Sequence, residues 1–226
     1  MGEIPKGWEI KVLDDLVTRV LGGDWGADEP TQDQLIASRC IRGADIPDLQ
    51  AGGKGKMPLR YLKPLSLEKR HLEEDDLVVE ISGGSPTQST GRPVLISNRL
   101  LERLDAPLVC SNFCRLIKLK KPLYNKFVYL WLRNLYMNDE FLQFENGTTG
   151  IKNLAFTLFS SSYKFCVPDD PLLEEFQTFI TLLFERLQVF AAETDTLTAL
   201  REALLPKLIS GELRTQEVKD YIGRKL

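Results

Sequence analysis

The sequence has little of what metal sites and catalytic triads are built from. It contains a single histidine, His71, and its four cysteines form no C-x-x-C pair. A structural zinc site needs Cys and His clustered at short spacing, and no triad partners stand near the one histidine. We therefore expect no bound metal and interpret the cysteines as reduced, structural residues: Cys40, Cys110, Cys114 and Cys166.

Long apolar runs are absent as well. None reaches the ~18 residues that a membrane span needs, and residues 1–8 lack the basic and then apolar regions of a signal peptide. The apolar share of 43% and the charged share of 27% are ordinary for a globular protein. The sequence thus predicts a cytoplasmic protein without membrane contact, and its 226 residues allow one large domain or two small ones.

Signatures of nucleotide-using and DNA-modifying enzymes are also missing. The glycine-rich stretch 52–57 is not a P-loop, because Gln50 replaces the first glycine and Met57 replaces the Ser or Thr. No Asn-Pro-Pro or Asp-Pro-Pro followed by an aromatic residue occurs, so the chain lacks the usual means of methylating a flipped adenine. We assign the acidic run 73–76 no metal or acid–base role. The expectation is a non-catalytic protein without a cofactor of its own.

Basic residues are not in excess, but they are unevenly distributed. The net charge is −3, which argues weakly against bulk binding to nucleic acid. Residues 34–71 carry eight basic and three acidic side chains, and residues 83–133 carry nine and two, with the acidic run 73–80 between them. The two basic segments either form one face that meets DNA phosphates or are evenly solvated, and charge alone does not separate these interpretations.

What the sequence does contain is a mixed pattern of strands and helices over residues 1–168. Aromatic and apolar residues at helical spacing predict a helix at 126–138. Short β-branched segments predict strands at 40–46, 76–82, 92–97 and 108–119, the last interrupted at Asn112. The predicted class is α+β: one mixed α/β domain with a mostly antiparallel sheet, followed by a long C-terminal helix of the coiled-coil type.

Polar, glycine-rich loops separate these strands. Gln, Arg and hydroxyl side chains suit the edges of DNA bases, and lysines suit phosphates. We predict that loop 83–92 reads sequence, that loop 147–153 is a second such loop, and that loop 50–58 contacts mostly phosphates. The alternative for each reading loop is an ordinary hairpin turn. The predicted DNA-binding residues are Lys54, Lys56, Arg60, Ser85, Thr87, Gln88, Ser89, Thr90, Arg92, Thr148, Thr149 and Lys152.

The pattern changes at residues 168–171, where two prolines flank two aspartates. We place a boundary there, between a domain at 1–168 and a helical region at 169–226. The helix from Leu172 to about Leu205 would be ~50 Å long. Pro206 is expected to kink or end it, and Gly211 is a plausible stop.

Apolar residues in this region step alternately by four and three, which is the pattern of a coiled-coil seam. Thr194 and Arg201 interrupt it. The helix either packs on its own domain or serves as an extended spacer or dimer helix; we favour the second, because an apolar stripe this long needs a partner. The predicted seam consists of Phe176, Ile180, Leu183, Leu187, Phe190, Leu197 and Leu204.

Several segments resemble the specificity subunits of Type I restriction–modification systems. The ending Leu204–Arg214, Leu-Leu-Pro-Lys-Leu-Ile-Ser-Gly-Glu-Leu-Arg, is the most specific match, and the matches cover nearly the whole chain. The others are Pro5-x-Gly7-Trp8 with Leu13-x-Asp15, Ile41–Ile46, Asp75–Val79 before Gly83–Arg92, Gly147–Leu154, and Val167-Pro168 before the acidic helix.

The resemblance implies a DNA-reading domain and a long helix that binds adenine methyltransferase subunits and sets the spacing of half-sites. S-adenosylmethionine and ATP would then belong to partner subunits, among them a possible nuclease. Usual members hold two target recognition domains and two helices, whereas this chain holds one of each, so we expect a half-subunit, natural or truncated. Two copies with antiparallel helices would form a homodimer and read a palindrome with a non-specific spacer, because protein symmetry is mirrored in the site.

Two other functions stay open. One is a coiled-coil adaptor whose globular domain binds protein rather than DNA, and the other is an enzyme whose site carries no recognised signature. A steep salt dependence of binding to duplex DNA favours the specificity subunit over the adaptor. Methylation by the chain alone favours the enzyme.

Overall fold

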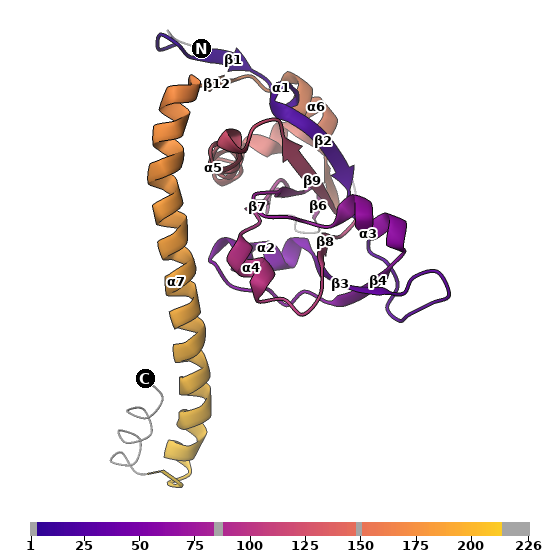
Figure 1. The fold of residues 1–226 in the computed structure, drawn as a ribbon, viewed down its shortest axis with the longest axis vertical. Coiled ribbons are helices and arrows are strands. Elements are labelled where there is room, and N and C mark those ends of the chain that lie inside the picture. Colours follow the sequence, from indigo (N-terminus) through magenta and orange to yellow (C-terminus); the bar gives the residue numbers. More distant parts are fainter. Residues whose placement is uncertain (1–3, 84–87, 148–150, 214–226) are drawn as a thin grey trace.

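The apolar stretch 108–119 is split by a turn at Asn112, as the sequence predicts. Its halves, β8 (Leu108–Cys110) and β9 (Cys114–Leu119), enter different sheets, so this turn joins two sheets of the domain. In the computed structural model these sheets and several short helices gather beside one long helix (Figure 1). The structure describes residues 4–83, 88–147 and 151–213.

Among the described strands every pairing is antiparallel except that of β3 with β8. The predicted fold class is therefore confirmed, although the strands form four small sheets rather than one. In sheet order these are β2 (Val17–Gly22), β9, β5 (Leu77–Glu80) and β7 (Pro93–Leu95); β4 (Leu59–Leu62), β3 (Ile36–Ile41) and β8; β10 (Glu145–Asn146), β11 (Lys152–Leu154) and β6 (Ser82–Gly83); and β1 (Glu9–Lys11) with β12 (Phe165–Val167).

Helices connect these strands. The predicted helix at 126–138 is confirmed as α5 (Asn125–Met137). The other helices of the domain are short: α1 (Leu13–Leu16), α2 (Ile46–Gln50), α3 (Pro64–Arg70), α4 (Asn98–Glu102), α6 (Phe156–Ser162) and the 3-10 turns η1 (Gly43–Asp45), η2 (Pro122–Tyr124) and η3 (Glu140–Phe144).

The prediction of a strand at 40–46 is wrong in its second half. The strand ends at Ile41, and the chain turns at once through η1 into α2. Asp45 stabilises this turn, because its carboxylate accepts hydrogen bonds from the backbone N–H of Arg42 (3.0 Å) and from the Arg42 guanidinium. Pro47 then lies in the first turn of α2, where a missing backbone N–H costs nothing. Local capping therefore overrides the β-branched composition.

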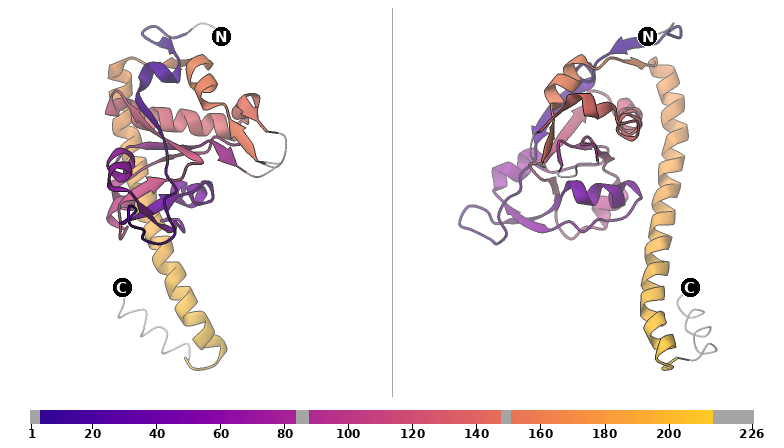
Figure 2. Two further views of the ribbon diagram at one scale, coloured as in Figure 1. Left: turned by 90° about the vertical axis from the view of Figure 1, so that its right-hand side faces the viewer. Right: turned by 180° about the vertical axis from the view of Figure 1, so that it is seen from behind.

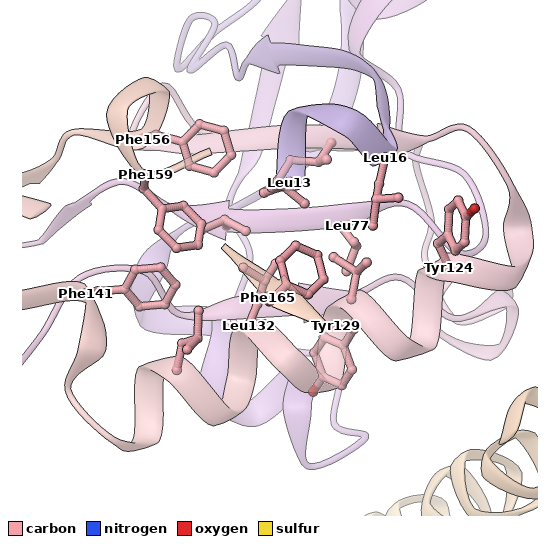
Figure 3. Packing of buried hydrophobic residues seen from close by; sticks show 14 of the residues in the cluster. Leu13, Leu16, Leu77, Tyr124, Tyr129, Leu132, Phe141, Phe156, Phe159 and Phe165 are labelled. Atoms are coloured by element: carbon pink, nitrogen blue, oxygen red, sulfur yellow. The ribbon is translucent and has the colours of Figure 1, made fainter. Parts of the chain in front are cut away.

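Aromatic rings form the centre of the larger core (Figure 3). Trp131 of α5 stacks on Phe165 of β12 with ring centroids 3.8 Å apart. Phe159 of α6 meets Phe141 edge to face at 4.9 Å. Such pairs contribute about 0.5–1.5 kcal/mol beyond the burial of their area. The cluster joins α5, α6 and β12 into one unit, and this unit carries the start of the long helix.

That helix, α7, runs from Asp170 to Ile209, longer than predicted at both ends. Its 40 residues span ~60 Å, and its last turns project beyond the domain (Figures 1 and 2). Pro206 lies in the last turn, so the helix ends three residues beyond it rather than at it. Gly211 follows the C-terminal cap with a φ of +73° and confirms the predicted stop. None of the described helices combines the length and apolarity needed to cross a membrane.

The first half of α7 packs against its own domain. Phe176 meets Phe127 edge to face at 6.1 Å, and Phe184 meets Tyr129 at 5.7 Å. Farther along, Asp195 forms an ion pair with Arg103 of the domain. The expectation of a single apolar stripe reserved for a partner is therefore wrong, because one stripe of this helix is used within the chain.

A second apolar stripe faces away from the domain. Phe179, Leu183, Phe190 and Leu197 are exposed on the helix, whereas Leu173 is completely buried against the domain. At 100° per residue the exposed stripe lies about 115° around the helix from Leu173 and Phe184, so it flanks the face that packs on the domain. Of the predicted seam, the exposed members are Leu183, Leu187, Phe190 and Leu197, the half-buried ones are Phe176 and Ile180, and Leu204 is buried.

Candidate nucleic-acid interface

The two polar loops singled out by the sequence start from neighbouring strands. Strand β6 pairs with β11 so that Gly83 lies opposite Lys152 and Ser82 opposite Asn153. The Ser82 hydroxyl donates to the Asn153 side-chain oxygen, although the two residues are 71 positions apart. This small sheet stands out from the side of the domain (Figure 2, left). The predicted residues Ser85, Thr87, Thr148 and Thr149 lie outside the described residues.

Glu145 organises the base of these loops. Its Oε1 accepts hydrogen bonds from the Thr90 N–H (2.6 Å), the Thr90 hydroxyl (2.8 Å) and the Ser89 hydroxyl (3.3 Å), and Lys152 lies 3.3 Å from its Oε2. Burial alone would raise the pKa of Glu145, but these hydrogen bonds and Lys152 together lower it below its ordinary value. The prediction that Ser89 and Thr90 face DNA is wrong, because both are buried, and Lys152 is occupied by the same carboxylate.

Arg92 is likewise used inside the domain. Its guanidinium forms two hydrogen bonds with the Glu80 carboxylate, at 2.7 and 2.8 Å, and both side chains are largely buried. The hydrogen bonds that Arg92 donates to the Glu80 carboxylate raise the pKa of Arg92. Gly43 leaves the room for this pair, since a Cβ there would stand 1.9 Å from a Glu80 oxygen. The prediction of Arg92 as a freely projecting base reader is therefore wrong.

Arg60 is buried as well, with only 4% of its surface exposed. It donates to the backbone oxygens of Trp25 (2.8 Å) and Gly26 (3.2 Å), pairs with Asp28, and lies 4.3 Å from the centre of the Trp25 ring. Burial lowers the pKa of Arg60. Its predicted contact with DNA is wrong, because this side chain holds Trp25 in place.

The remaining predicted residues are exposed. Gln88 donates to the Tyr136 hydroxyl at 3.1 Å. Lys54 and Lys56 project from a loop whose backbone is held by Asp48, which accepts from the Gly55 N–H at 2.7 Å. A rigid loop with outward lysines fits the predicted phosphate contact, and that role stays a prediction.

A hollow of about 760 Å³ lies between these groups. Its walls come from the η1 turn, the β5–β6 segment and the β8–β9 turn, and the Glu80–Arg92 ion pair lies in its lining. Among its lining residues that were not predicted to bind DNA are Trp25, Arg42, Asn112 and Phe113. Two had left a signal in the sequence: Asn112 interrupts a strand, and Arg42 belongs to the segment Ile41–Ile46 that resembles specificity subunits.

The charges lining this hollow are paired. Arg42 is bound to Asp45 (3.0 Å) and Arg92 to Glu80 (2.7 Å), so the lining offers amide, hydroxyl and aromatic groups without a strong excess of charge. Arg42 also lines a second hollow, about 830 Å³, together with Lys54, Lys56 and residues of α7. One concave surface thus extends from the projecting sheet to the long helix.

The buried cysteines have no part in this surface chemistry. Burial raises the pKa of Cys40 and of Cys114 to about 12, so both stay thiols at neutral pH. Cys40, Cys110 and Cys114 are buried and Cys166 is half-buried, and their reduced state stays a prediction.

Comparison with known proteins gives one significant curated relative. The chain is 26% identical over 230 aligned positions to the specificity subunit of the Type I restriction enzyme MjaIX from Methanocaldococcus jannaschii. The alignment covers 96% of this chain and 46% of the relative. The resemblance to Type I specificity subunits stated from the sequence is thereby confirmed. No family model matches the chain.

One solved structure supports the fold, and a second matches with a lower score. The S subunit of a Type I restriction–modification system from M. genitalium matches with a TM-score of 0.54 and 16% identity, over 90% of this chain and 46% of that one. The HsdS subunit from Thermoanaerobacter tengcongensis matches with a TM-score of 0.47 and 13% identity, over 94% of this chain and 47% of that one. The chain therefore spans about half the length of the relatives it matches.

Proposed function

We propose that this chain is a non-catalytic DNA sequence-specificity subunit that recognises one half-site of a bipartite target. It positions adenine methyltransferase subunits, and in a restriction complex nuclease subunits, on that site in the cytoplasm. S-adenosylmethionine and ATP are used by those partners. The observation that carries the proposal is the concave surface itself: two polar loops start from one small sheet beside a hollow lined by hydrogen-bonding groups, with two exposed lysines next to it.

The form of the proposed complex follows from the exposed stripe of α7. Phe179, Leu183, Phe190 and Leu197 are large apolar side chains in contact with water. Burying each is worth roughly 1.5–3 kcal/mol before the entropy of association is subtracted. A second copy supplies a matching stripe when the helices pair antiparallel. The two reading domains then lie at opposite ends of the pair, as a palindromic site with a spacer requires.

The test is co-purification with adenine methyltransferase subunits, followed by mapping of methylated adenines. We expect methylation at a bipartite palindrome only when this chain is present. Methylation whose sequence is the same with and without the chain would exclude a specificity role.

The adaptor is the second candidate, and the same exposed stripe favours it. The adaptor hypothesis predicts that two helices pair without a methyltransferase, as the specificity-subunit hypothesis does, but it predicts no preference among DNA duplexes. A binding assay with two unrelated duplexes and increasing salt separates the two: an adaptor shows neither sequence preference nor a salt slope.

The proposal also predicts that the isolated chain has no methyltransferase, nuclease or ATPase activity. The expectation rests on the missing signatures of those enzymes in the sequence. Each activity is measured with the purified chain at several concentrations. Turnover that scales with this protein through successive purification steps would contradict the assignment.

A further inference from the structure

The turn between β8 and β9 presents two exposed side chains on a firmly held backbone. Asn112 and Phe113 are exposed, with 51% of the Phe113 surface in contact with solvent, and both line the hollow described above. Ser111 on one side and Cys114 on the other are buried.

Backbone hydrogen bonds hold this turn from three directions. The Phe113 carbonyl accepts from the N–H groups of Ile81 (2.8 Å) and Ser82 (3.3 Å). The Ser111 N–H donates to the Ile41 carbonyl at 2.9 Å, and the Gly23 N–H donates to the Cys114 carbonyl at 3.2 Å. The turn is therefore preorganised, and little entropy is lost when its side chains meet a ligand.

Gly23 makes this arrangement possible by close approach. A Cβ at that position would stand 2.1 Å from the Ser111 carbonyl oxygen. Trp25, which also lines the hollow, is held too, because the buried Arg60 guanidinium donates a hydrogen bond to the Trp25 carbonyl and lies over its ring. The lining of the hollow thus includes two aromatic residues on held backbone and an amide among its polar groups.

We propose that Asn112 and Phe113 are specificity-determining residues that read adjacent A·T base pairs. This inference rests on the proposed function and adds the bases that are read. An asparagine amide matches adenine, donating to N7 and accepting from N6, and a phenyl ring contacts the C5-methyl group of thymine. Because its charges are paired, the hollow suits base edges rather than phosphates. The exposed Lys54 and Lys56 are placed to meet the phosphates.

The first step of the test is selection of preferred duplexes from a random library by the wild-type chain. A motif with adjacent A·T pairs is expected. Selection of no motif would overturn both the proposed function and this inference, and a motif without such pairs would overturn this inference alone.

The second step compares variants on the selected duplex. Asn112→Ala and Phe113→Ala are each expected to weaken binding about ten-fold or more, to lose the preference at one A·T pair, and to bind random duplex as the wild type does. Leu158→Ala is the matched control, since Leu158 is an equally exposed apolar residue (57%) on α6, outside the hollow. Variants that bind and select like the wild type would overturn the inference and leave the proposed function intact.

The third step changes the DNA and compares the response of the wild type with that of the two variants. Replacing the contacted thymine by uracil removes one methyl group, which should weaken wild-type binding about four-fold, and 7-deazaadenine removes the N7 acceptor. Phe113→Ala should be indifferent to uracil, and Asn112→Ala to 7-deazaadenine. Equal losses in wild type and variant would overturn the assignment of that residue.

Discussion

The basic side chains of this domain divide into two classes at the residue scale. Arg60 and Arg92 are buried and hold other groups in place, Trp25 in one case and Glu80 in the other. Lys54 and Lys56, by contrast, project from the surface. Charge in the sequence does not distinguish these classes, because a buried guanidinium and an exposed ammonium count alike. The distinction is testable through stability.

Arg60→Ala should lower the free energy of unfolding by about 2–3 kcal/mol, because carbonyl oxygens lose their donor and the Trp25 ring loses its cation. Denaturant unfolding measures this, and the tryptophan emission of the folded variant should shift to the red as Trp25 loosens. Lys56→Ala is the control and should leave the unfolding curve unchanged. An Arg60→Ala protein that is as stable as the wild type but binds DNA more weakly would support a direct contact between Arg60 and DNA, against the structural argument.

Glu145 makes the stability of the projecting sheet depend on pH. Its pKa in the folded protein lies below the ordinary 4.5, so its contribution is present above that value and is lost as the pH falls through the lowered pKa. In Glu145→Gln the decline of the unfolding free energy between about pH 5 and pH 3 should be shallower. Thr90→Val, which removes one donor, should lie between the two. If the unfolding free energy of both variants declines with falling pH as steeply as that of the wild type, the protonation of this carboxylate is not linked to folding.

At the scale of the element, α7 has two apolar stripes with different roles. One packs on the domain through Leu173 and Phe184, and the other, which begins at half-buried Phe176, exposes Leu183 and Phe190. A helix with apolar residues on two adjacent faces satisfies the sequence patterns for both intrachain packing and pairing. The alternative of packing on the domain is therefore realised over the first half of the helix, and pairing through the exposed stripe remains a proposal.

Leu183→Asp combined with Phe190→Asp should give a monomer with a folded domain. Two carboxylates buried in a helix seam destabilise pairing far more than carboxylates on an exposed face of the same helix. Light scattering at tens of micromolar measures the mass. Thr178→Asp with Thr196→Asp is the matched control, since both threonines are exposed and bond only to their own helix. A wild-type chain that is already monomeric under these conditions would refute unaided pairing.

For the whole molecule, the net charge of −3 and the proposed binding to DNA have to be reconciled. The proposal depends on the local exposure of Lys54 and Lys56, because α7 carries much of the acidic excess and brings Asp195 and Glu202 into the same hollow. Local charge then governs contact with phosphates, and net charge governs repulsion at longer range.

The Lys54→Ala, Lys56→Ala double variant should weaken binding to all duplexes alike and flatten the plot of log affinity against log salt by about 1–2 units. Fluorescence anisotropy from 50 to 200 mM salt, as a rough range, measures the slope. Lys164→Ala, an exposed lysine near the start of α7, is the control and should leave the slope unchanged. A slope unaffected by the double variant would place the phosphate contacts elsewhere.

Much of the architecture was determined by the sequence alone. The break at Asn112, the helix α5, the stop at Gly211 and the long helix α7 all follow from local patterns, because turns, caps and helical periodicity act over a few residues. The likeness to specificity subunits was visible for the same reason, since its motifs are short and contiguous.

Tertiary structure alone decided which polar residues are free to meet a ligand. Thr90 and Arg92 occupy a loop that looks suited to bases, but Glu145 and Glu80, distant in sequence, bind their side chains. Asn112 and Phe113 looked like a flaw in a strand until the fold placed them in a hollow. Burial and ion pairing depend on which distant segments come together, and no local pattern carries that information.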